Sequence, residues 1–410
     1  FLRPLGLRLV YSEADREALH AQIADEAVCI GPARAADSYL NMDNIISAAL
    51  ASGCQAIHPG FGFLSENPDF AERITQAGLA FIGPTAATIR LMGDKSEAKR
   101  NAIAAGVPVA LGTDGPLRDF DEAISEAERI GYPVMLKAAS GGGGKGIRVA
   151  ESVKDLKDAY DSAAAEAIAN FGDGRLYMEK YIHNPRHIEV QILGDNYGNV
   201  VHLFERECSV QRRHQKLIEE SPSAFVTPEL REKMTSAAVA LAKRVGYRNA
   251  GTIEFLVDND RNFYFCEMNT RIQVEHPVTE EVTGVDLVCE QLRVAAGEPL
   301  SFQQEDLTIR GHAIECRINA EDPSRNFAPC PGTLVSLHLP GGPGVRVDSA
   351  AYQGYKIPPF YDSMIGKLIV YGSDRTQAID RMRRALAETL FEGVVTGTDY
   401  QMHILCSKAF

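Results

Sequence analysis

Residues 140–149 read SGGGGKGIRV, and this glycine-rich stretch decides which nucleotide-binding fold the sequence can form. Its glycines satisfy the G-x-G-x-x-G spacing, which opens a helix in dinucleotide-binding folds. Here, however, residues 132–137 before it and residues 147–149 after it both have the pattern of strands. A P-loop needs Ser or Thr after its lysine, but Gly146 follows Lys145. We therefore expect a glycine loop between two strands, a mobile flap whose backbone N–H groups close over phosphates; a flexible hairpin without a ligand is the alternative.

The composition is that of a globular protein of two or three domains. The chain has 410 residues, of which 24% are charged and 45% are hydrophobic. The net charge of −13 argues against nucleic-acid binding or attachment to a membrane surface. No apolar run reaches the roughly 18 residues that cross a membrane, and the first residues do not form a signal peptide. The eight cysteines form no C-x-x-C pair, which indicates a reducing compartment, either the cytoplasm or a mitochondrial or plastid matrix.

The first part of the chain alternates strands with helices. Strands are predicted at 7–11, 55–58 and 80–82, with helices at 43–52 and 69–76, an order typical of a parallel sheet covered by helices. The clearest helix follows. Asp94 caps it, Glu97 completes a capping box, and Gly106 ends it.

The later part of the chain has a different secondary-structure pattern. Residues 110–181 form an αβ segment around the glycine loop, with another strand in RLYMEKY. From His187 onward the pattern is one of antiparallel hairpins, with turns at 196–199 and 259–262. The predicted fold class is therefore α/β at the start and α+β in the C-terminal part.

Two carboxylates in the second of these hairpins should face each other across neighbouring strands. With the turn placed as above, Asp258 pairs with Phe263 and Glu254 lies opposite Glu267. The two carboxylates repel each other unless a cation lies between them, and Asn269 points to the same face. Glutamate and asparagine offer the oxygen ligands that suit Mg²⁺ held jointly with substrate phosphates. A solvated sheet face with exposed acids is the alternative.

The same face continues beyond the acids. In EMNTRIQVEH, the odd positions all point one way if the chain stays extended. They are Glu267, Asn269, Arg271, Gln273 and Glu275. This order of side chains indicates a metal site that continues into an anion site, with a carboxylate at its far end. The order is acid, amide, arginine, amide and acid.

Clustered cations supply candidate phosphate contacts. The run CSVQRRHQK (208–216) combines basic residues with glutamines; such runs usually form a solvated face, and a binding surface is the second interpretation. Lys95 occupies the first turn of its helix, where the dipole disfavours cations, and Lys137 ends a strand predicted to be buried. A nearby phosphate would offset both costs, whereas a snorkelling side chain is the alternative for each. Together these features predict phosphoryl transfer from Mg-ATP, and the lack of H-R-D and D-F-G motifs excludes a protein kinase.

From about Tyr11 to Gly372, the sequence resembles the biotin carboxylase component of biotin-dependent carboxylases of the acetyl-CoA carboxylase type. The matching strings are HPGFGFLSEN, FIGPT, LMGDK, KAASGGGGKGIRV, YMEKYIHNPRHIEVQ, ERECSVQRRHQKLIEE, FCEMNTRIQVEHPVTE, ECRINAEDP and PPFYDSMIGKLI. The resemblance implies an ATP-grasp fold. We expect an N-terminal αβ (pre-ATP-grasp) domain at 1–82, a helical linker at 83–109, a lid with the glycine loop at 110–181, and a C-terminal domain at 182–410 with the metal, bicarbonate and biotin sites.

The resemblance also implies roles for individual residues. The implied nucleotide contacts are Lys95, Lys137, Gly143, Gly144, Glu179, Lys180, Tyr181, Ile182, His187, Gln211 and His214. The implied Mg²⁺ ligands are Glu254, Glu267 and Asn269, in agreement with the hairpin argument. The implied bicarbonate contacts are Lys216, Arg271, Gln273 and Val274. Glu275 matches the general base and Arg317 the arginine that stabilises the biotin enolate, so the catalytic set is Lys216, Arg271, Glu275 and Arg317.

The implied reaction is the first half-reaction of a biotin-dependent acyl-CoA carboxylase, as in fatty acid biosynthesis. The base deprotonates bicarbonate, which attacks the γ-phosphate of ATP, and carboxyphosphate then delivers CO₂ to the ureido nitrogen of biotin. The implied cofactors are ATP and two Mg²⁺ ions, for which Mn²⁺ can substitute. Nothing resembles the AMKM biotinylation site, so biotin should arrive on a carrier protein or domain. A carboxyltransferase component and a second copy in a homodimer are the other expected partners.

The sequence departs from the family in places. Position 61 is Phe, where the family often has a Tyr beside the biotin pocket. We do not find the family's first strand, NRGEIA-like turn and helix, and we expect the N-terminal domain to lack them; GTDYQMHILCSKAF at the C-terminus matches poorly. Two other classes compete: another ATP-grasp ligase (half of a carbamoyl-phosphate synthase, or a purine-pathway carboxylase) and a non-catalytic nucleotide-binding domain. RRHQK, RIQVEHP and ECRINAED favour biotin carboxylase.

Overall fold

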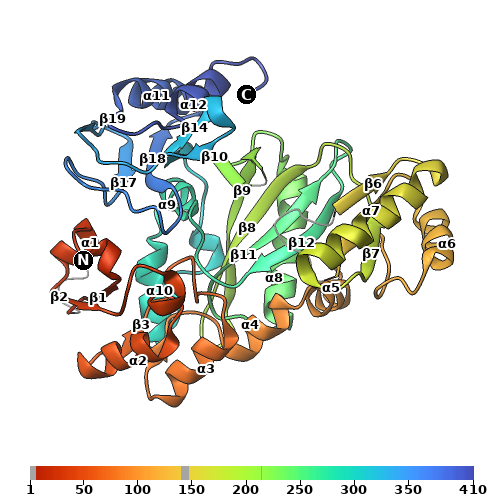
Figure 1. Ribbon diagram of the computed structural model, residues 1–410, viewed down its shortest axis with the longest axis horizontal. Coiled ribbons are helices and arrows are strands. Elements are labelled where there is room, and N and C mark those ends of the chain that lie inside the picture. The colour runs from red at the N-terminus through yellow and green to blue at the C-terminus, as the bar shows by residue number, and fades with distance from the viewer. Residues whose placement is uncertain (1–5, 140–146, 214) are drawn as a thin grey trace.

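The computed structural model describes residues 6–139, 147–213 and 215–410 (Figure 1). An eight-stranded sheet occupies the centre, and a separate small sheet with two helices lies at one side of it. The N-terminal segment, red to orange, packs below the large sheet, and the C-terminal helices, blue, lie above it. None of the described helices has the length and apolar character needed to cross a bilayer. All eight cysteines are free, as their spacing predicts.

The N-terminal segment contains the predicted parallel pairing, but in two separate sheets. Strand β1 (Arg8–Tyr11) pairs in parallel with β2 (Glu26–Cys29), and β3 (Ala56–Ile57) pairs in parallel with β4 (Ala80–Phe81). The helices are α1 (Leu19–Ile23), α2 (Met42–Ala51) and α3 (Pro68–Gln76). Neither α1 nor β2 was predicted from the sequence. Most of their residues are half-exposed, so the two elements have no strong apolar pattern that would reveal them.

Two helices lead from this segment to the small sheet. They are α4 (Ala86–Gly93) and α5 (Lys95–Ala104). Asp94 ends the first and caps the second: its Oδ1 accepts hydrogen bonds from the backbone N–H groups of Ser96 and Glu97, both at 2.9 Å. The Glu97 carboxylate is engaged by Arg100. The predicted N-cap is therefore confirmed, whereas the side chain expected to complete a capping box binds a neighbour on the helix surface.

The small sheet holds the strands that flank the glycine loop. Its order is β6 (Ile147–Ala150), β5 (Val134–Ala138), β7 (Leu176–Lys180), with both pairs antiparallel. Helices α6 (Phe120–Ile130) and α7 (Val153–Phe171) contribute to an apolar core beneath it. The predicted strands on both sides of the loop are thus confirmed, but Gly143 and Gly144 lie outside the described residues.

The large sheet is antiparallel throughout, as the hairpin patterns predict. Its order is β12-β11-β8-β9-β10-β13-β18-β17. The bounds are β8 Arg186–Gly194, β9 Val200–Arg212, β10 Gln215–Ser221, β11 Asn249–Val257, β12 Phe263–Asn269, β13 His312–Asn319, β17 Val345–Asp348 and β18 Met364–Gly372. Helix α8 (Pro228–Arg244) packs against β8 and β9, and α9 (His276–Thr283) packs against β9, β10, β13 and β18.

The remaining elements surround the sheet. They are α10 (Leu287–Ala295), α11 (Arg375–Glu388), α12 (Thr398–Leu405), β14 (Glu321–Asp322), β15 (Ala328–Pro329), β16 (Ser336–His338) and β19 (Leu390–Glu392). Helix α11 packs on β13 and β18 and shares an apolar core with them that includes Met382 and Leu386.

The β11–β12 hairpin combines a correct prediction with a wrong one. Glu254 does lie opposite Glu267, but Val257, and not Asp258, pairs with Phe263. Asp258 is drawn into the turn because its carboxylate accepts the N–H groups of Asp260 and Asn262 at 2.9 and 2.8 Å. An irregularity between Glu254 and Phe255 restores the register, so the bulge brings the two acids face to face.

Replacing Asp94 with Ala should lower the free energy of unfolding by about 1 kcal/mol, because two N–H groups at the start of α5 lose their acceptor. The measurement is urea unfolding followed by circular dichroism. The control is Glu97→Ala, which removes only an exposed contact to Arg100 and should lower the free energy of unfolding much less than loss of the cap. Equal losses in the two variants would show that Glu97 contributes to the cap after all.

Candidate active site

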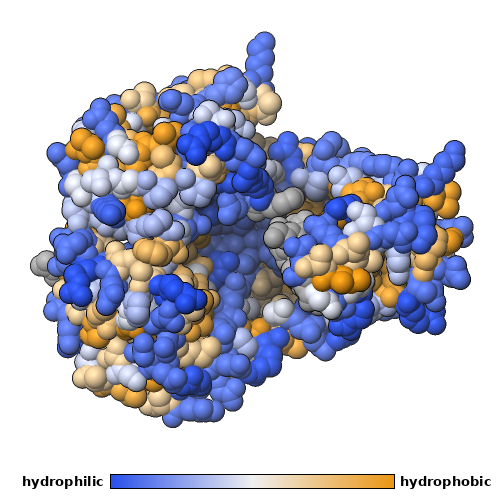
Figure 2. Space-filling model, viewed as in Figure 1, coloured by the Kyte–Doolittle hydropathy of each residue, from blue (hydrophilic) through white to orange (hydrophobic). Residues whose placement is uncertain are grey.

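A cleft with a hydrophilic floor separates the small sheet and its helices from the rest of the molecule (Figure 2). Strands β8, β11 and β12 of the large sheet lie on the side nearest this unit (Figure 1). Glu267 near the end of β12 is exposed, while Glu254 opposite it is only 4% exposed. The cleft therefore leads from an open carboxylate to buried charged groups within the sheet.

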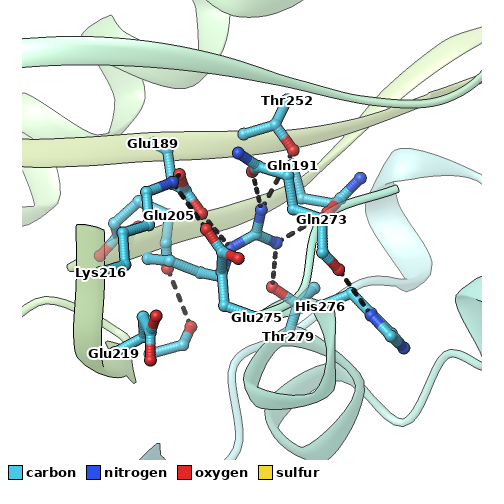
Figure 3. Close-up of polar contacts among 12 residues, drawn as sticks. Glu189, Gln191, Glu205, Lys216, Glu219, Thr252, Gln273, Glu275, His276 and Thr279 are labelled. Carbon is cyan, nitrogen blue, oxygen red and sulfur yellow. Dashed lines mark hydrogen bonds and ion pairs between the residues drawn. The ribbon is translucent and has the colours of Figure 1, made fainter. Parts of the chain in front are cut away.

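The centre of these buried groups is the ammonium of Lys216 on β10. Its Nζ donates to Glu275 Oε1 at 2.6 Å and also binds Glu189 (Figure 3). The same Nζ donates to Glu254 Oε1 at 2.9 Å. Burial alone would lower the pKa of Lys216, but the carboxylates outweigh it and raise that pKa well above its usual value. Lys216 is thus a permanent cation that joins carboxylates from β8, β11 and the start of α9.

A second buried cation, Arg206 on β9, lies on the other side of Glu189. It is fully buried, and its Nε donates to Glu189 Oε1 at 2.5 Å. Its remaining N–H groups donate to Gln191 at 2.7 Å, Gln273 at 2.9 Å, and Thr252 and Thr279 at 3.0 Å. Because Arg206 occupies Gln273 Oε1, the Gln273 amide turns its Nε2 toward Glu254 Oε1, at 2.9 Å.

The two opposed carboxylates of the hairpin have different environments. Glu254 receives hydrogen bonds from Lys216, Asn269 and Gln273, and His187 lies 2.9 Å from its other oxygen. Burial would raise the pKa of Glu254, but Lys216 and His187 hold it well below its usual range. The Glu267 side chain is open to solvent but has protein atoms around it, and this partial desolvation and then the charge of Glu254 raise its pKa. A cation between the two would relieve this repulsion, so the arrangement fits the predicted Mg²⁺ site.

Arg317 on β13 connects the base position to the interior of the sheet. Its Nε donates to Glu219 Oε1 at 2.6 Å and its Nη2 to Glu275 Oε2 at 2.9 Å. Glu275 occupies the N-cap of α9, where the helix dipole favours a negative charge. Burial would raise the pKa of Glu275, but Lys216 and Arg317 hold it well below its usual range. Glu275 is therefore an ionised carboxylate between two cations.

The extended chain on which the predicted alternation depends ends at Asn269, where β12 ends, and residues 270–275 contain bends and a turn. Asn269, Gln273 and Glu275 nevertheless reach the same charged network. Arg271 donates to Asn269 Oδ1 at 3.0 Å and to Glu66 Oε2 at 2.8 Å. Glu66 belongs to the N-terminal segment, so this contact attaches that segment to the site. The Val274 carbonyl accepts a hydrogen bond from Lys367 on β18 at 2.8 Å, which fixes the backbone just before Glu275.

The cleft wall formed by the small sheet carries its own ion pair. Lys137 Nζ donates to Glu179 Oε2 at 2.5 Å, and Lys99 lies 3.7 Å from the same carboxylate. Burial lowers the pKa of Lys137, but Glu179 outweighs it and the net shift is upward. The anion that Lys137 needs is thus supplied by the protein itself, so the position of this lysine does not by itself require a phosphate.

Other predicted nucleotide contacts lie near this wall. Lys180 at the end of β7 donates to the carbonyls of Gly131 and Tyr132 at 2.9 and 2.7 Å. Tyr181 and Ile182 follow it directly and are half-buried. Lys95 is the first residue of α5, and Gln211 on β9 donates to the Cys208 carbonyl at 2.9 Å. His214 lies outside the described residues.

The run 208–216 does not form one solvated face. Arg212 binds Glu321 and lies over the Phe327 ring, Arg213 is exposed, and Lys216 is buried among carboxylates. Several buried charged residues of the same sheet were not predicted from the sequence, and those that border the site are Glu189, Arg206, Glu219 and Glu315. The available signal was a charged residue within an apolar strand, as in IEVQIL, where Glu189 and Gln191 alternate with aliphatic residues; that pattern ordinarily predicts a solvated face.

Two clusters of potential metal-binding side chains occur among the described residues. They are His187 with Glu189 and Glu254, and Glu189 with Cys208 and Glu275. Lys216 already binds the carboxylates of both clusters, so its ammonium neutralises them. Glu267 belongs to neither cluster, and its side chain is exposed.

The sequence matches three family descriptions over nearly its whole length. These are the biotin carboxylase N-terminal domain at 5–89, the ATP-binding domain of the carbamoyl-phosphate synthase L chain at 94–303, and the biotin carboxylase C-terminal domain at 315–410. It is 55% identical over 411 residues to biotin carboxylase 1 of Bacillus subtilis, covering 100% of this chain and 91% of that protein. It is also 53% identical over 411 residues to the biotin carboxylase of Pseudomonas aeruginosa, covering 100% and 91%.

Solved structures agree with these family matches. The biotin carboxylase–β,γ-ATP complex from Campylobacter jejuni superimposes with a TM-score of 0.94 at 50% identity, covering 100% of this chain and 92% of that one. The biotin carboxylase domain dimer of Hydrogenobacter thermophilus 2-oxoglutarate carboxylase, with MgADP, ADP and bicarbonate, has a TM-score of 0.93 at 51% identity, covering 100% and 90%. The ATP-grasp fold is thereby confirmed. An ATP-binding domain shared with carbamoyl-phosphate synthases leaves the choice of ligase open, but the domains on both sides of it settle that choice, and the chain belongs to the biotin carboxylase family of ATP-dependent ligases.

Proposed function

We propose that the residues around Lys216 divide the biotin carboxylase reaction between a phosphate side and a base side. The chain carries out ATP- and bicarbonate-dependent carboxylation of biotin. One observation carries the division of roles: the Lys216 ammonium contacts both Glu254, opposite the exposed Glu267, and Glu275, the carboxylate at the start of α9. A single fixed cation thus links the two ends of the site.

On the phosphate side, the cleft wall and the hairpin hold the nucleotide and its metal. Lys95 and Lys137 bind phosphate oxygens, and Gly143 and Gly144 of the glycine loop bind them through backbone N–H groups. The remaining nucleotide contacts are Glu179, Lys180, Tyr181, Ile182, His187, Gln211 and His214. Glu254, Glu267 and Asn269 would hold Mg²⁺, which supplies charge neutralisation at the γ-phosphate when bound. The support is the opposed register of the two acids and the raised pKa of Glu267.

On the base side, bicarbonate binds where the donors converge. Lys216, Arg271, Gln273 and the backbone at Val274 surround it, and Glu275 takes its proton so that the anion can attack the γ-phosphate. Glu275 is ionised, as a base must be, because Lys216 and Arg317 lower its pKa. Arg317 then stabilises the negative charge that develops on the ureido oxygen of biotin. Carboxyphosphate formation and biotin carboxylation therefore share one carboxylate and its two cations.

The partners follow from this chemistry. Biotin is presented by a carrier protein or domain, and a carboxyltransferase component passes the carboxyl group to an acyl acceptor, as in acetyl-CoA carboxylase. A homodimer is supported by the dimer of the Hydrogenobacter thermophilus domain. The proposed domain limits remain 1–82, 83–109, 110–181 and 182–410. The proposal is tested by measuring ATP cleavage with bicarbonate, with and without free biotin: cleavage that does not depend on bicarbonate would contradict it.

Replacing Glu267 with Gln should lower ATP turnover at saturating Mg²⁺ by about 10²-fold or more, the size expected when a group that stabilises developing charge is lost. The melting temperature should not fall, because the change relieves repulsion with Glu254. The measurements are steady-state ATPase and differential scanning calorimetry. Glu220→Gln, which alters a carboxylate of the same sheet bound to Arg375 and His312, is the control. ATPase near the wild-type rate in Glu267→Gln would remove Glu267 from the metal site.

Replacing Arg317 with Ala should separate the two half-reactions. Carboxybiotin formation should fall roughly 10²- to 10³-fold, as on loss of an oxyanion-stabilising group. Bicarbonate-dependent ATPase should fall less, because Lys216 continues to hold Glu275. Arg375→Ala is the matched control. It also removes the cationic partner of a buried carboxylate, Glu220, but Arg375 has no role in the proposed reaction. Parallel loss of both activities at equal folded fraction would make Arg317 a structural residue only.

A further inference from the structure

Two carboxyl groups behind Arg317 have no function in the reaction described above. Glu219 on β10 and Glu315 on β13 are directly opposite each other in the antiparallel register, and both are fully buried. Within the described part of the chain, Glu219 Oε2 and both oxygens of Glu315 have no hydrogen-bond partner. Buried ionised carboxylates without donors are strongly unfavourable, so this pair requires an explanation.

The charges around the pair do not balance if every carboxyl group is ionised. Three cations, Arg206, Lys216 and Arg317, face five carboxylates, which are Glu189, Glu219, Glu254, Glu275 and Glu315. Lys367 is the only other cation close to Glu315 among the described residues, and it is already held by Asp348 at 3.4 Å and the Val274 carbonyl. Negative charge is therefore in excess within the sheet if all of these carboxyl groups are ionised.

A proton lowers that excess and also pairs two of the three unpaired oxygens with each other. An ionised carboxylate can only accept hydrogen bonds, whereas a protonated carboxyl group can donate one to the carboxylate opposite it. Two carboxyl groups that share a site cannot both ionise at neutral pH. Burial raises the pKa of Glu219 to about 7, and burial and Glu219 keep that of Glu315 well above its usual range.

We propose that Glu219 and Glu315 share one proton within the sheet and that this acid pair positions Arg317 for the biotin half-reaction. With the proton in place, the pair carries a single negative charge, which Arg317 binds through Nε while its Nη2 reaches Glu275. Loss of the proton adds a second negative charge behind Arg317. The guanidinium is then drawn toward the sheet and stabilises negative charge on biotin less well. The role of Arg317 in this step rests on the function proposed above.

The pair is enclosed on all sides. The titratable groups around it are Cys208 from β9, Lys216 from β10, Cys316 and Arg317 from β13, Lys367 from β18 with Asp348 from β17, and Glu275 with His276 at the start of α9. The thiol pKa values of Cys208 and Cys316 are raised well above the usual value, and the pKa of His276 is lowered to about 3, chiefly by burial in each case. These three groups therefore stay neutral around pH 7 and leave the acid pair as the group that titrates.

The shared proton is tested by infrared difference spectroscopy at neutral pH, comparing the wild type with Glu315→Gln and with Glu219→Gln. A protonated carboxyl group absorbs above the amide bands. Because one proton belongs to both residues, each variant should lose the same single carboxyl band. The control is Glu220→Gln, whose carboxylate neighbours Glu219 but is ionised by His312 and Arg375 and has no such band to lose. If the band persists in either variant, the shared proton is disproved whatever Arg317 does.

The positioning role is tested by the ratio of carboxybiotin formation to ATP cleavage as a function of pH. In the wild type this ratio should fall on the alkaline side by about tenfold per pH unit, the slope of a single ionisation. In Glu315→Gln the pair can never carry two charges, so the ratio should stay level there, while Glu220→Gln should follow the wild type. An alkaline fall that is the same in Glu315→Gln and wild type would overturn the positioning role. If the band disappears in both variants but Arg317→Ala spares carboxybiotin formation, the function proposed for Arg317 fails and the acid pair stands.

Discussion

The site depends on one buried interaction, the ammonium of Lys216 held by three carboxylates from separate parts of the chain. Glu189 comes from β8, Glu254 from β11 and Glu275 from the start of α9. Removing such a cation would leave several charges unpaired in the interior, which costs far more than a surface ion pair contributes. Strand order, register and the position of α9 must therefore all be correct before the ammonium is satisfied, and each part of the fold is constrained by the same atom.

The architecture meets this constraint with local adjustments. In the β11–β12 hairpin, Asp258 is drawn into the turn, and a bulge returns Glu267 to its place opposite Glu254. The end of β12 then frees residues 270–275 to bend toward Arg206 and Lys216, while Glu66 fixes Arg271 from the N-terminal segment. Irregular backbone lies where the side chains need to be redirected, and the rest of the sheet stays regular.

Local features of the site could be predicted from the sequence, and long-range pairings could not. Alternation and turn residues were enough to oppose Glu254 and Glu267, because both belong to one hairpin. The partners of Arg317 could not be found this way, because Glu219 on β10 is distant in the sequence and only the strand order brings it beside Arg317. Glu189 and Arg206 were missed for a related reason. In a single strand, a polar side chain on an alternating pattern predicts a solvated face, and only the covering helix α9 makes that face an interior one.

The cost of burying so many charges indicates what they are for. Apolar residues of similar size at these positions would hold the sheet together at least as well, since ion pairs removed from water seldom gain more than their desolvation costs. Charged groups fixed before the substrates arrive, however, need no reorganisation when negative charge moves during the reaction. Arg206 illustrates the point: it touches neither the cleft nor the base, yet its hydrogen bonds determine which way the Gln273 amide faces and where Glu189 holds Lys216. The buried network thus fixes the orientation of the charged side chains. It keeps Lys216 and Arg317 in place at a cost in stability.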